Sequence, residues 1–318
     1  MMEKKRFGNS DMDITRLGLG AWAIGGSWAW GWGRQEDDES VKTIHKALDS
    51  GINWIDTAPV YGLGHSEEVV GKALAETSHT PYVFSKCGLV WDDGKNVSGV
   101  LKKDSVRKEV EESLRRLNLE VLDLCQIHWP NPDEDVEEAW ETLAELQREQ
   151  KIRYIGVSNF SVEQIKRAEK IAPVTSLQPP YSLVFPGVED EILPYCLERG
   201  IAVINYSPMA SGLLSGKMSE ERLSNLPADD WRHKSPDFSK KRLGRNLAVA
   251  DLLGEIGKPG GFTAGEVAIA WTLLNPAVTA AIVGMRKPEQ IEGVIHAADF
   301  SLSGDDINAI KGFLSENP

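Results

Sequence analysis

A repeated order of elements runs along most of this 318-residue chain: a short apolar strand, a loop and an amphipathic helix. Strands that alternate with helices pair in parallel through right-handed crossovers. Eight such units suit a closed barrel, so the pattern predicts an α/β fold with one (β/α)8 TIM barrel over residues 1–318. The strands are expected near residues 16–20, 53–56, 82–86, 122–128, 153–157, 175–178, 202–205 and 279–283. The helices are expected near residues 38–50, 65–77, 104–118, 135–150, 161–171, 188–199 and 263–274.

Three segments stand outside this repeat. Residues 5–15 are interpreted as two short strands around a polar turn, an N-terminal β-hairpin ahead of the barrel. Residues 25–33 are rich in Trp and Gly, and residues 206–241 are long and polar. Both segments follow barrel strands, so we expect both loops to overhang the C-terminal face, where such barrels keep their sites.

Two helix starts carry local signals. Ser66 is expected to cap the helix that follows it. Ser161, with Gln164 three residues later, predicts a capping box.

The composition argues against several classes of protein. Asp and Glu outnumber Lys and Arg by 48 to 35, and this net charge of -13 disfavours a general nucleic-acid binder. Cys87, Cys125 and Cys196 lack the spacing of metal ligands and are interpreted as buried free thiols in a reducing compartment. The first residues lead into no signal peptide, and no apolar stretch approaches the length of a membrane span. The sequence therefore predicts a cytoplasmic protein without a membrane partner.

Polar side chains mark the ends of three consecutive predicted strands. Asp56, Lys86 and His128 end the second, third and fourth strands, and Tyr61 lies in the loop after the second. Because the carboxyl ends of parallel strands meet at one end of a barrel, we expect these side chains to ring its mouth. Each has an ordinary explanation alone: a capping Asp, a core-edge Tyr, a snorkelling Lys or a satisfied His. Their coincidence at consecutive strand ends favours a functional site.

This group of side chains suits proton transfer. Lys86 ends an apolar strand, so its ammonium should be buried and paired with Asp56. A cation beside Tyr61 favours the phenolate and is expected to lower the tyrosine pKa from about 10. Tyr61 can then act as a general acid or base near neutral pH, while His128 shares the proton or orients a carbonyl oxygen. The group contains no nucleophile and no set of metal ligands.

Motifs spread over nearly the whole chain carry a family resemblance. They are GINWIDTA at 51–58 leading to YG at 61–62, Lys86, His128, GVSNF at 156–160, YSPMASGLLSGK at 206–217 and GMRKPEQ at 284–290. With them the chain resembles the aldo-keto reductases, and within that family the bacterial branch of NADPH-dependent reductases that includes general stress protein 69. The motifs are specific as an ordered set, whereas any one of them is weak.

The resemblance implies an oxidoreductase that reduces aldehydes or ketones to alcohols with NADPH. The implied catalytic tetrad is Asp56, Tyr61, Lys86 and His128: Tyr61 protonates the carbonyl oxygen, Lys86 and Asp56 tune Tyr61, and His128 orients the substrate. The implied NADP(H)-binding residues are Ala21, Trp22, Asp56, Ser158, Asn159, Gln178, Tyr206, Ser207, Pro208, Met209, Ala210, Ser211, Lys217, Gly284, Arg286 and Gln290.

Parts of that set have separate implied roles. Ser158, Asn159 and Gln178 would hold the nicotinamide carboxamide, which needs both donors and acceptors, and Tyr206 would stack on the nicotinamide ring. Residues 207–217 resemble the loop that crosses the pyrophosphate. Unaided by the resemblance, Ser158-Asn159 is an ordinary turn before a helix.

The last predicted strand is followed by cations at the start of a helix. Arg286 and Lys287 therefore suit a phosphate, and the resemblance implies the 2′-phosphate of NADP, with Gln290 at the adenine. The chain departs from the family pattern nearby, because many members have Glu-Asn where this chain has Gly293-Val294. The strictness of NADP over NAD is therefore open.

One motif points to a different fold. Gly18-Leu19-Gly20-Ala21-Trp22-Ala23 matches the loose G-x-G-x-x-A fingerprint of dinucleotide-binding folds, with Asp37 or Asp38 near the expected distance. A loop rich in Gly and Trp follows it instead of a helix, which disfavours a Rossmann fold.

Loop tryptophans indicate the substrate pocket. Trp22, Trp30, Trp91 and Trp129 are expected to contact an aromatic, sugar-like or small carbonyl substrate, although loop anchoring explains any single one equally well. Two other functions stay open: a slow NADPH-binding sensor resembling potassium-channel β subunits, and a barrel isomerase or lyase without nicotinamide. A monomer is expected.

Overall fold

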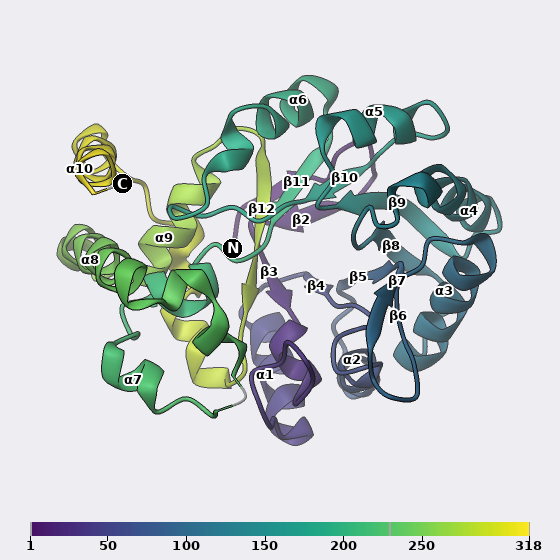
Figure 1. Cartoon of the computed structure of the whole chain (residues 1–318), viewed down its shortest axis with the longest axis horizontal. Helices are drawn as coiled ribbons and strands as arrows, with labels where there is room; N and C mark the ends of the chain where they lie inside the picture. Colours follow the sequence, from purple (N-terminus) through teal and green to yellow (C-terminus); the bar gives the residue numbers. More distant parts are fainter. Residues whose placement is uncertain (1, 229, 318) are drawn as a thin grey trace.

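Eight parallel strands close into a barrel with helices around it, which confirms the predicted fold class (Figure 1). The computed structural model describes residues 2–228 and 230–317. In the order in which they pair, the barrel strands are β3 (Leu17–Gly20), β4 (Trp54–Asp56), β5 (Tyr82–Cys87), β8 (Leu122–Ile127), β9 (Ile152–Ser158), β10 (Ser176–Gln178), β11 (Ala202–Asn205) and β12 (Val278–Gly284). Each of the eight predicted strands overlaps one of them.

The outer layer contains the predicted helices. They are α1 (Asp37–Asp49), α2 (His65–Ala75), α3 (Lys103–Leu117), α4 (Val136–Arg148), α5 (Val162–Glu169), α6 (Ile192–Arg199) and α9 (Ala264–Leu273). Each of the amphipathic helices buries one apolar stripe, as α1 does with Val41, Ile44 and Leu48. The helix α9 differs, because nearly all of its residues are buried.

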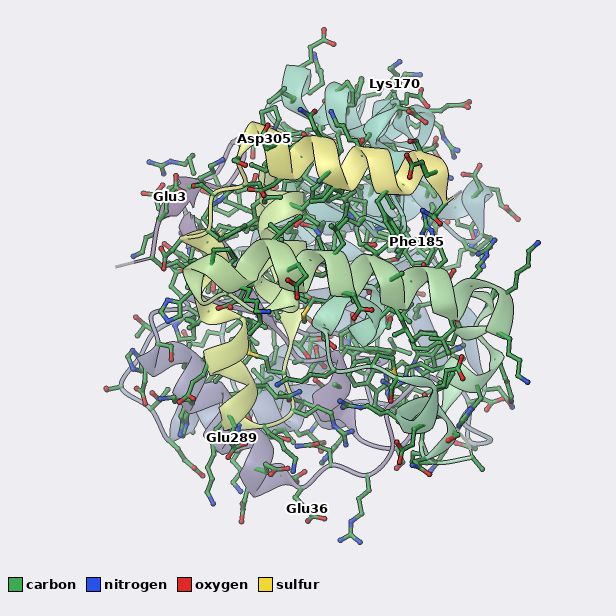
Figure 2. The ribbon with its side chains drawn as sticks, turned by 90° about the vertical axis from the view of Figure 1, so that its left-hand side faces the viewer. Glu3, Glu36, Lys170, Phe185, Glu289 and Asp305 are labelled. Atoms are coloured by element: carbon green, nitrogen blue, oxygen red, sulfur yellow. The ribbon has the colours of Figure 1, made fainter. Side chains whose placement is uncertain are left out.

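Elements outside the repeat explain the burial of α9. The long helix α8 (Lys240–Gly257) packs on α9, and α10 (Gly304–Glu316) packs on α8. Figure 2 shows α8 and α10 lying on one flank of the molecule. Both helices lie outside the predicted elements, as do the short α7 (Glu220–Ser224) and the antiparallel hairpin of β6 (Leu89–Trp91) and β7 (Val97–Gly99). Within the described residues, no helix is both long and apolar enough to cross a membrane.

The N-terminal hairpin closes the end of the barrel opposite its mouth, referred to below as the lower end. It consists of β1 (Lys4–Arg6) and β2 (Asp13–Thr15), as predicted. Its apolar side chains Phe7, Met12 and Ile14 are fully buried and join barrel-lining residues such as Trp54 and Phe84 in one cluster. This packing fills the interior from below and leaves the C-terminal end for polar side chains.

The glycines of the dinucleotide-like motif serve this packing. Gly18 lies in β3, and a Cβ built there would stand 2.2 Å from the ring of Trp54. The Trp54 ring is fully buried, and its Nε1 donates to the backbone oxygen of Thr15 at 2.9 Å. The closed barrel therefore excludes the Rossmann interpretation, and Gly18 makes room for a tryptophan.

A buried arginine joins the first barrel strand to the last. Arg16 is 5% exposed, and its Nη1 donates to the backbone oxygens of Val278 and Thr279 at 2.8 and 2.7 Å. Its Nη2 donates to the oxygen of Leu273 at 2.7 Å. These bonds close the seam where β3 pairs with β12.

One of the two predicted helix caps is correct. Ser161 and Gln164 form the expected capping box at the start of α5. Ser66 does not cap α2, because the N-cap is Gly64, whose φ of 102° ends the preceding turn. The Ser66 hydroxyl turns towards the barrel instead and lies 3.0 Å from the Thr57 hydroxyl.

Candidate active site

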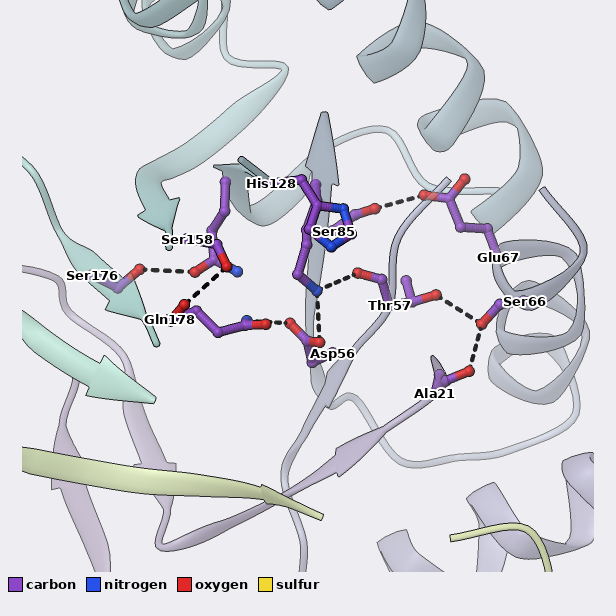
Figure 3. A network of polar contacts seen from close by, with 12 residues as sticks. Ala21, Asp56, Thr57, Ser66, Glu67, Ser85, His128, Ser158, Ser176 and Gln178 are labelled. Carbon is purple, nitrogen blue, oxygen red and sulfur yellow. Dashed lines mark hydrogen bonds and ion pairs between the residues drawn. The ribbon is translucent and has the colours of Figure 1, made fainter. Parts of the chain in front are cut away.

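The predicted lysine–aspartate pair lies at the mouth of the barrel. Asp56 ends β4, Lys86 lies near the end of the neighbouring strand β5, and both side chains are buried. Lys86 Nζ donates to Asp56 Oδ1 at 2.7 Å and to the backbone oxygen of Thr57 at 3.0 Å (Figure 3). An ammonium without water needs such partners, so the pair fixes the lysine under the mouth.

Tyr61 and His128 complete the predicted constellation. The loop after β4 places the Tyr61 ring 5.0 Å from Lys86 Nζ, measured to the ring centroid. His128 follows β8, and its ring centroid lies 5.7 Å from that of Tyr61 at an interplanar angle of 79°. The four side chains therefore meet at one end of the barrel, as their strand-end positions predicted.

The pKa of Tyr61 differs from the prediction. Burial of the phenol, with the negative charge of Asp56, raises the Tyr61 pKa well above its ordinary value of 10. The expectation that the cation lowers the pKa of Tyr61 is wrong, because burial outweighs the effect of the lysine. Burial also lowers the pKa of Lys86, against the opposing effect of Asp56. Tyr61 consequently keeps its proton over the physiological range.

His128 is neutral in this environment. Burial of the ring and the positive charge of Lys86 lower the His128 pKa well below 6.5. A neutral imidazole has one N–H donor and one acceptor nitrogen. It can therefore donate a hydrogen bond to a carbonyl oxygen without placing a second positive charge beside Lys86.

The predicted nicotinamide residues connect directly to this group. Gln178 Nε2 donates to the second carboxylate oxygen of Asp56 at 2.8 Å, and Ser158 Oγ donates to the backbone oxygen of Gln178 at 2.9 Å (Figure 3). Asn159 Nδ2 donates to the backbone oxygen of His128 at 3.0 Å, and the Tyr206 hydroxyl donates to Asn159 Oδ1 at 2.9 Å. Strands β8 to β11 therefore bring together residues that are far apart in the sequence.

Backbone strain gathers at the other predicted cofactor positions. Eight described non-glycine residues have a positive φ, and four of them belong to the predicted cofactor set. These four are Asn159 (63°), Ser207 (55°), Ala210 (48°) and Ser211 (57°). Left-handed backbone is costly for such residues and concentrates at ligand sites. Residues 207–211 thus form a strained turn directly after β11 and Tyr206.

Arg286 joins the Trp-rich loop to the end of β12. Its Nε donates to Gln35 Oε1 at 2.8 Å, and its Nη1 and Nη2 donate to the backbone oxygens of Trp32 and Arg34 at 2.9 and 2.6 Å. Gln290 Oε1 accepts from the backbone N–H of Arg286 at 2.7 Å. Lys287 Nζ lies 3.7 Å from Glu39, and Lys217 is exposed.

The predicted substrate tryptophans do not form one group. Trp30 and Trp129 are 47% and 45% exposed, whereas Trp22 packs against Trp32 and Trp231 with ring centroids 5.5 and 6.0 Å away. Trp28, which is not among the four predicted tryptophans, packs against the predicted acid, with its ring centroid 6.2 Å from that of Tyr61. Its position in the Trp-rich loop is the only feature of the sequence that indicates this contact with Tyr61.

A cleft beside this tryptophan has a volume of about 470 Å³. Its lining includes Trp28 and the predicted residue Trp91, together with Asp92 and Asp93 of the turn after β6. Over residues 2–228 and 230–317, no three His, Cys, Asp or Glu side chains gather as a metal site requires. Cys87, Cys125 and Cys196 are buried and free, as predicted.

Asp56, Tyr61, Lys86 and His128 thus share the mouth of one closed barrel. The family model described as "Aldo/keto reductase family" matches residues 16–315. The chain therefore belongs to the aldo/keto reductase family, whose members use nicotinamide cofactors.

Named relatives and a solved structure match over almost their full lengths. The aldo-keto reductase YhdN of Bacillus subtilis is 38% identical over 316 residues, which cover 98% of this chain and 94% of YhdN. The NADH-specific methylglyoxal reductase of Escherichia coli is 32% identical over 327 aligned residues, with 98% of each protein covered. Among solved structures, a glycerol dehydrogenase from Gluconobacter oxydans is 40% identical with a TM-score of 0.91, covering 99% of this chain and 97% of that one.

Proposed function

We propose that this protein reduces the carbonyl group of small aldehydes or ketones to an alcohol, with NADPH as the hydride donor and Tyr61 as the proton donor. The observation that carries the proposal is the buried Lys86–Asp56 pair beneath the ring of Tyr61, beside a neutral His128. A nicotinamide bound at the mouth supplies the hydride.

The protein's own residues handle the proton and the charge. His128 orients the substrate by donating a hydrogen bond to the carbonyl oxygen. As the carbonyl carbon gains a hydride, its oxygen becomes far more basic, and it takes the proton from the Tyr61 hydroxyl. The phenolate left on Tyr61 is stabilised by the ammonium of Lys86, whose Nζ lies 5.0 Å from the ring centroid. Solvent then returns the proton to Tyr61.

The raised pKa of Tyr61 is compatible with this role. It keeps the phenol protonated until substrate arrives, so the acid form is ready for reduction. A bound cofactor and substrate change the electric field around the phenol, so the pKa of Tyr61 during catalysis is that of the complex.

The cofactor assignment rests on the arrangement around the mouth. Ser158, Asn159 and Gln178 offer both donors and acceptors for a primary amide, and the left-handed turn at residues 207–211 suits the pyrophosphate. A guanidinium has five N–H groups, and three of those of Arg286 are engaged within the described chain. The other two suit a 2′-phosphate, which favours NADPH over NADH.

Names of relatives suggest the first substrates to test. The Escherichia coli relative acts on methylglyoxal, and the Gluconobacter oxydans structure is of a glycerol dehydrogenase. We therefore propose small oxygenated carbonyl compounds such as methylglyoxal and glyceraldehyde, bound between the tryptophans of the rim. We further propose that the protein works in the cytoplasm as a monomer, on small molecules alone.

The test is turnover of NADPH, followed at 340 nm with methylglyoxal, glyceraldehyde and an aromatic aldehyde. Tyr61→Phe should lower kcat by at least about 100-fold, because it removes the proton donor and leaves the ring. Tyr154→Phe is the matched control, since the Tyr154 hydroxyl contacts Asp11 in the hairpin segment at the lower end of the barrel. Tight NADPH binding without turnover in the wild type would overturn the reductase proposal and favour a sensor.

A further inference from the structure

The first turn of α2 contacts both strands that carry the reactive pair. Two consecutive residues make the contacts, Ser66 and Glu67, and both are fully buried. Ser66 bonds to the Thr57 hydroxyl and to the backbone oxygen of Ala21, each at 3.0 Å (Figure 3). Its backbone N–H donates to the oxygen of Tyr61 at 3.1 Å. The start of α2 therefore fixes the backbone on either side of the reactive phenol.

Glu67 reaches the other strand. Its Oε1 accepts a hydrogen bond from the Ser85 hydroxyl at 2.6 Å, and Ser85 directly precedes Lys86 in β5 (Figure 3). Since side chains alternate along a strand, Ser85 faces the helix while Lys86 faces the barrel mouth. A displacement of Ser85 would therefore displace the neighbouring ammonium.

The Glu67 carboxyl group is enclosed and paired with an arginine. Its Oε2 accepts from Arg116 Nε at 2.7 Å, and the exposed fractions of the two side chains are 0% and 8%. Arg116 also packs on the turn that carries Tyr61, because a Cβ built on Gly64 would stand 3.1 Å from Arg116 Cδ. A buried ion pair contributes little net stability, since desolvation of both charges offsets their attraction. Its place behind β5 points to a role other than stability.

We propose that Glu67 is a positioning residue for Lys86 and Tyr61, which holds β5 through Ser85 and places a negative charge behind the ammonium. The inference rests on the proposed reductase function for its kinetic effect. Burial lowers the pKa of Lys86, and the negative charges of Asp56 and, to a smaller extent, Glu67 oppose this effect. No group of the substrate or cofactor is required to touch Glu67.

Glu67→Gln keeps the size of the side chain and removes its charge. Removing a negative charge lowers the pKa of every nearby group, for the lysine and the phenol alike. The alkaline limb of the kcat/KM profile for NADPH-dependent reduction should therefore move to lower pH, by about 0.5 unit or more. Glu67→Asp keeps the charge, so the alkaline limb of its kcat/KM profile should stay at the wild-type pH. Its kcat should fall, because the shorter side chain loses the contact with Ser85.

Glu169→Gln is the matched control. Glu169, at the end of α5, also pairs with an arginine, Arg199, and accepts from a hydroxyl, that of Tyr195. It has the same kind of partners but no contact with β4 or β5, so its alkaline limb should stay at the wild-type pH. An unmoved limb in Glu67→Gln, or equal shifts in both variants, would overturn the proposal.

A second readout needs neither substrate nor cofactor. The 15N chemical shift of the Lys86 amine, assigned through Lys86→Met, follows its titration directly. Glu67→Gln should lower that pKa, and an unchanged pKa would overturn the inference. If the wild type shows no turnover but Glu67→Gln lowers the pKa of Lys86, the reductase function fails and the positioning role stands.

Should Glu67→Gln not fold, Ser85→Ala tests the same contact between β5 and Glu67. The kcat of Ser85→Ala should fall several-fold, and an unchanged kcat contradicts the proposal.

Discussion

At the scale of single residues, burial decides the charge states around the mouth. The sequence predicted the Asp56–Lys86 contact correctly, because a lysine at the end of an apolar strand needs a partner. It did not predict the direction of the Tyr61 pKa, because strand-end positions reveal neither the depth of the phenol nor the effect of Asp56. The tetrad was predictable from position, whereas its protonation required the packed structure.

Glu109 offers a test of the same principle on stability. Burial raises its pKa from 4.5 to about 7, although Glu109 Oε2 accepts from the backbone N–H of Gly88 at 2.9 Å. A raised pKa means that the folded state prefers the protonated form, so this contribution is present below pH 4.5 and is lost as the pH rises through 7. The loss is on the order of 3 kcal/mol.

Glu109→Gln should remove this pH dependence. Urea unfolding at pH 4.5 and pH 8 should show that the wild type loses more stability than the variant over that interval. Glu111→Gln, an exposed glutamate of the same helix, should follow the wild-type profile. Parallel losses in wild type and Glu109→Gln would show that Glu109 ionises at an ordinary pH.

At the scale of elements, the periodic part of the chain was predictable and the remainder was not. The alternation of strands and helices gave every barrel strand, because apolar spacing records which face of an element is buried. The pattern did not predict α8, because Gly244 and Gly254 weaken the helical signal and the apolar stripe of α8 packs on another helix. It misassigned Ser66, because the same residue type serves as a helix cap or as a buried hydroxyl.

The glycine of β3 gives a prediction at this scale. Gly18→Ala places a methyl group 2.2 Å from the ring of Trp54, which has no room to move because it is fully buried. Overpacking of this kind costs about 1–3 kcal/mol. Gly312→Ala, in α10 with no atom within 4 Å of the added Cβ, should instead leave stability equal or slightly higher. Equal unfolding midpoints for wild type and Gly18→Ala would contradict the packing argument.

At the scale of the whole molecule, cofactor binding should couple to stability. A ligand that binds only the folded chain adds about 2.7 kcal/mol at 100 times its Kd. NADPH should therefore raise the Tm, and by more than NADH at the same concentration, if Arg286 supplies its two remaining N–H groups to the 2′-phosphate. Thermal unfolding with each cofactor, with Kd from tryptophan fluorescence, measures the preference.

Arg286→Ala should reduce NADPH affinity by about tenfold or more and leave NADH affinity nearly unchanged. Arg34→Ala is the control, because the Arg34 side chain pairs with Glu36 and only its backbone oxygen meets Arg286. Equal losses of affinity for NADPH and NADH in Arg286→Ala would show that Arg286 holds the Trp-rich loop and does not select the 2′-phosphate.

The seam at Arg16 governs when the polypeptide can finish folding. Its guanidinium is satisfied by backbone oxygens of residues 273, 278 and 279, more than 250 positions later. During synthesis the N-terminal part leaves the ribosome long before these acceptors exist, so Arg16 stays hydrated and β3 keeps one edge unpaired. The barrel can therefore close only when the polypeptide is complete. Chains cut short before β12 leave the edge of β3 open, and this edge can pair with other chains.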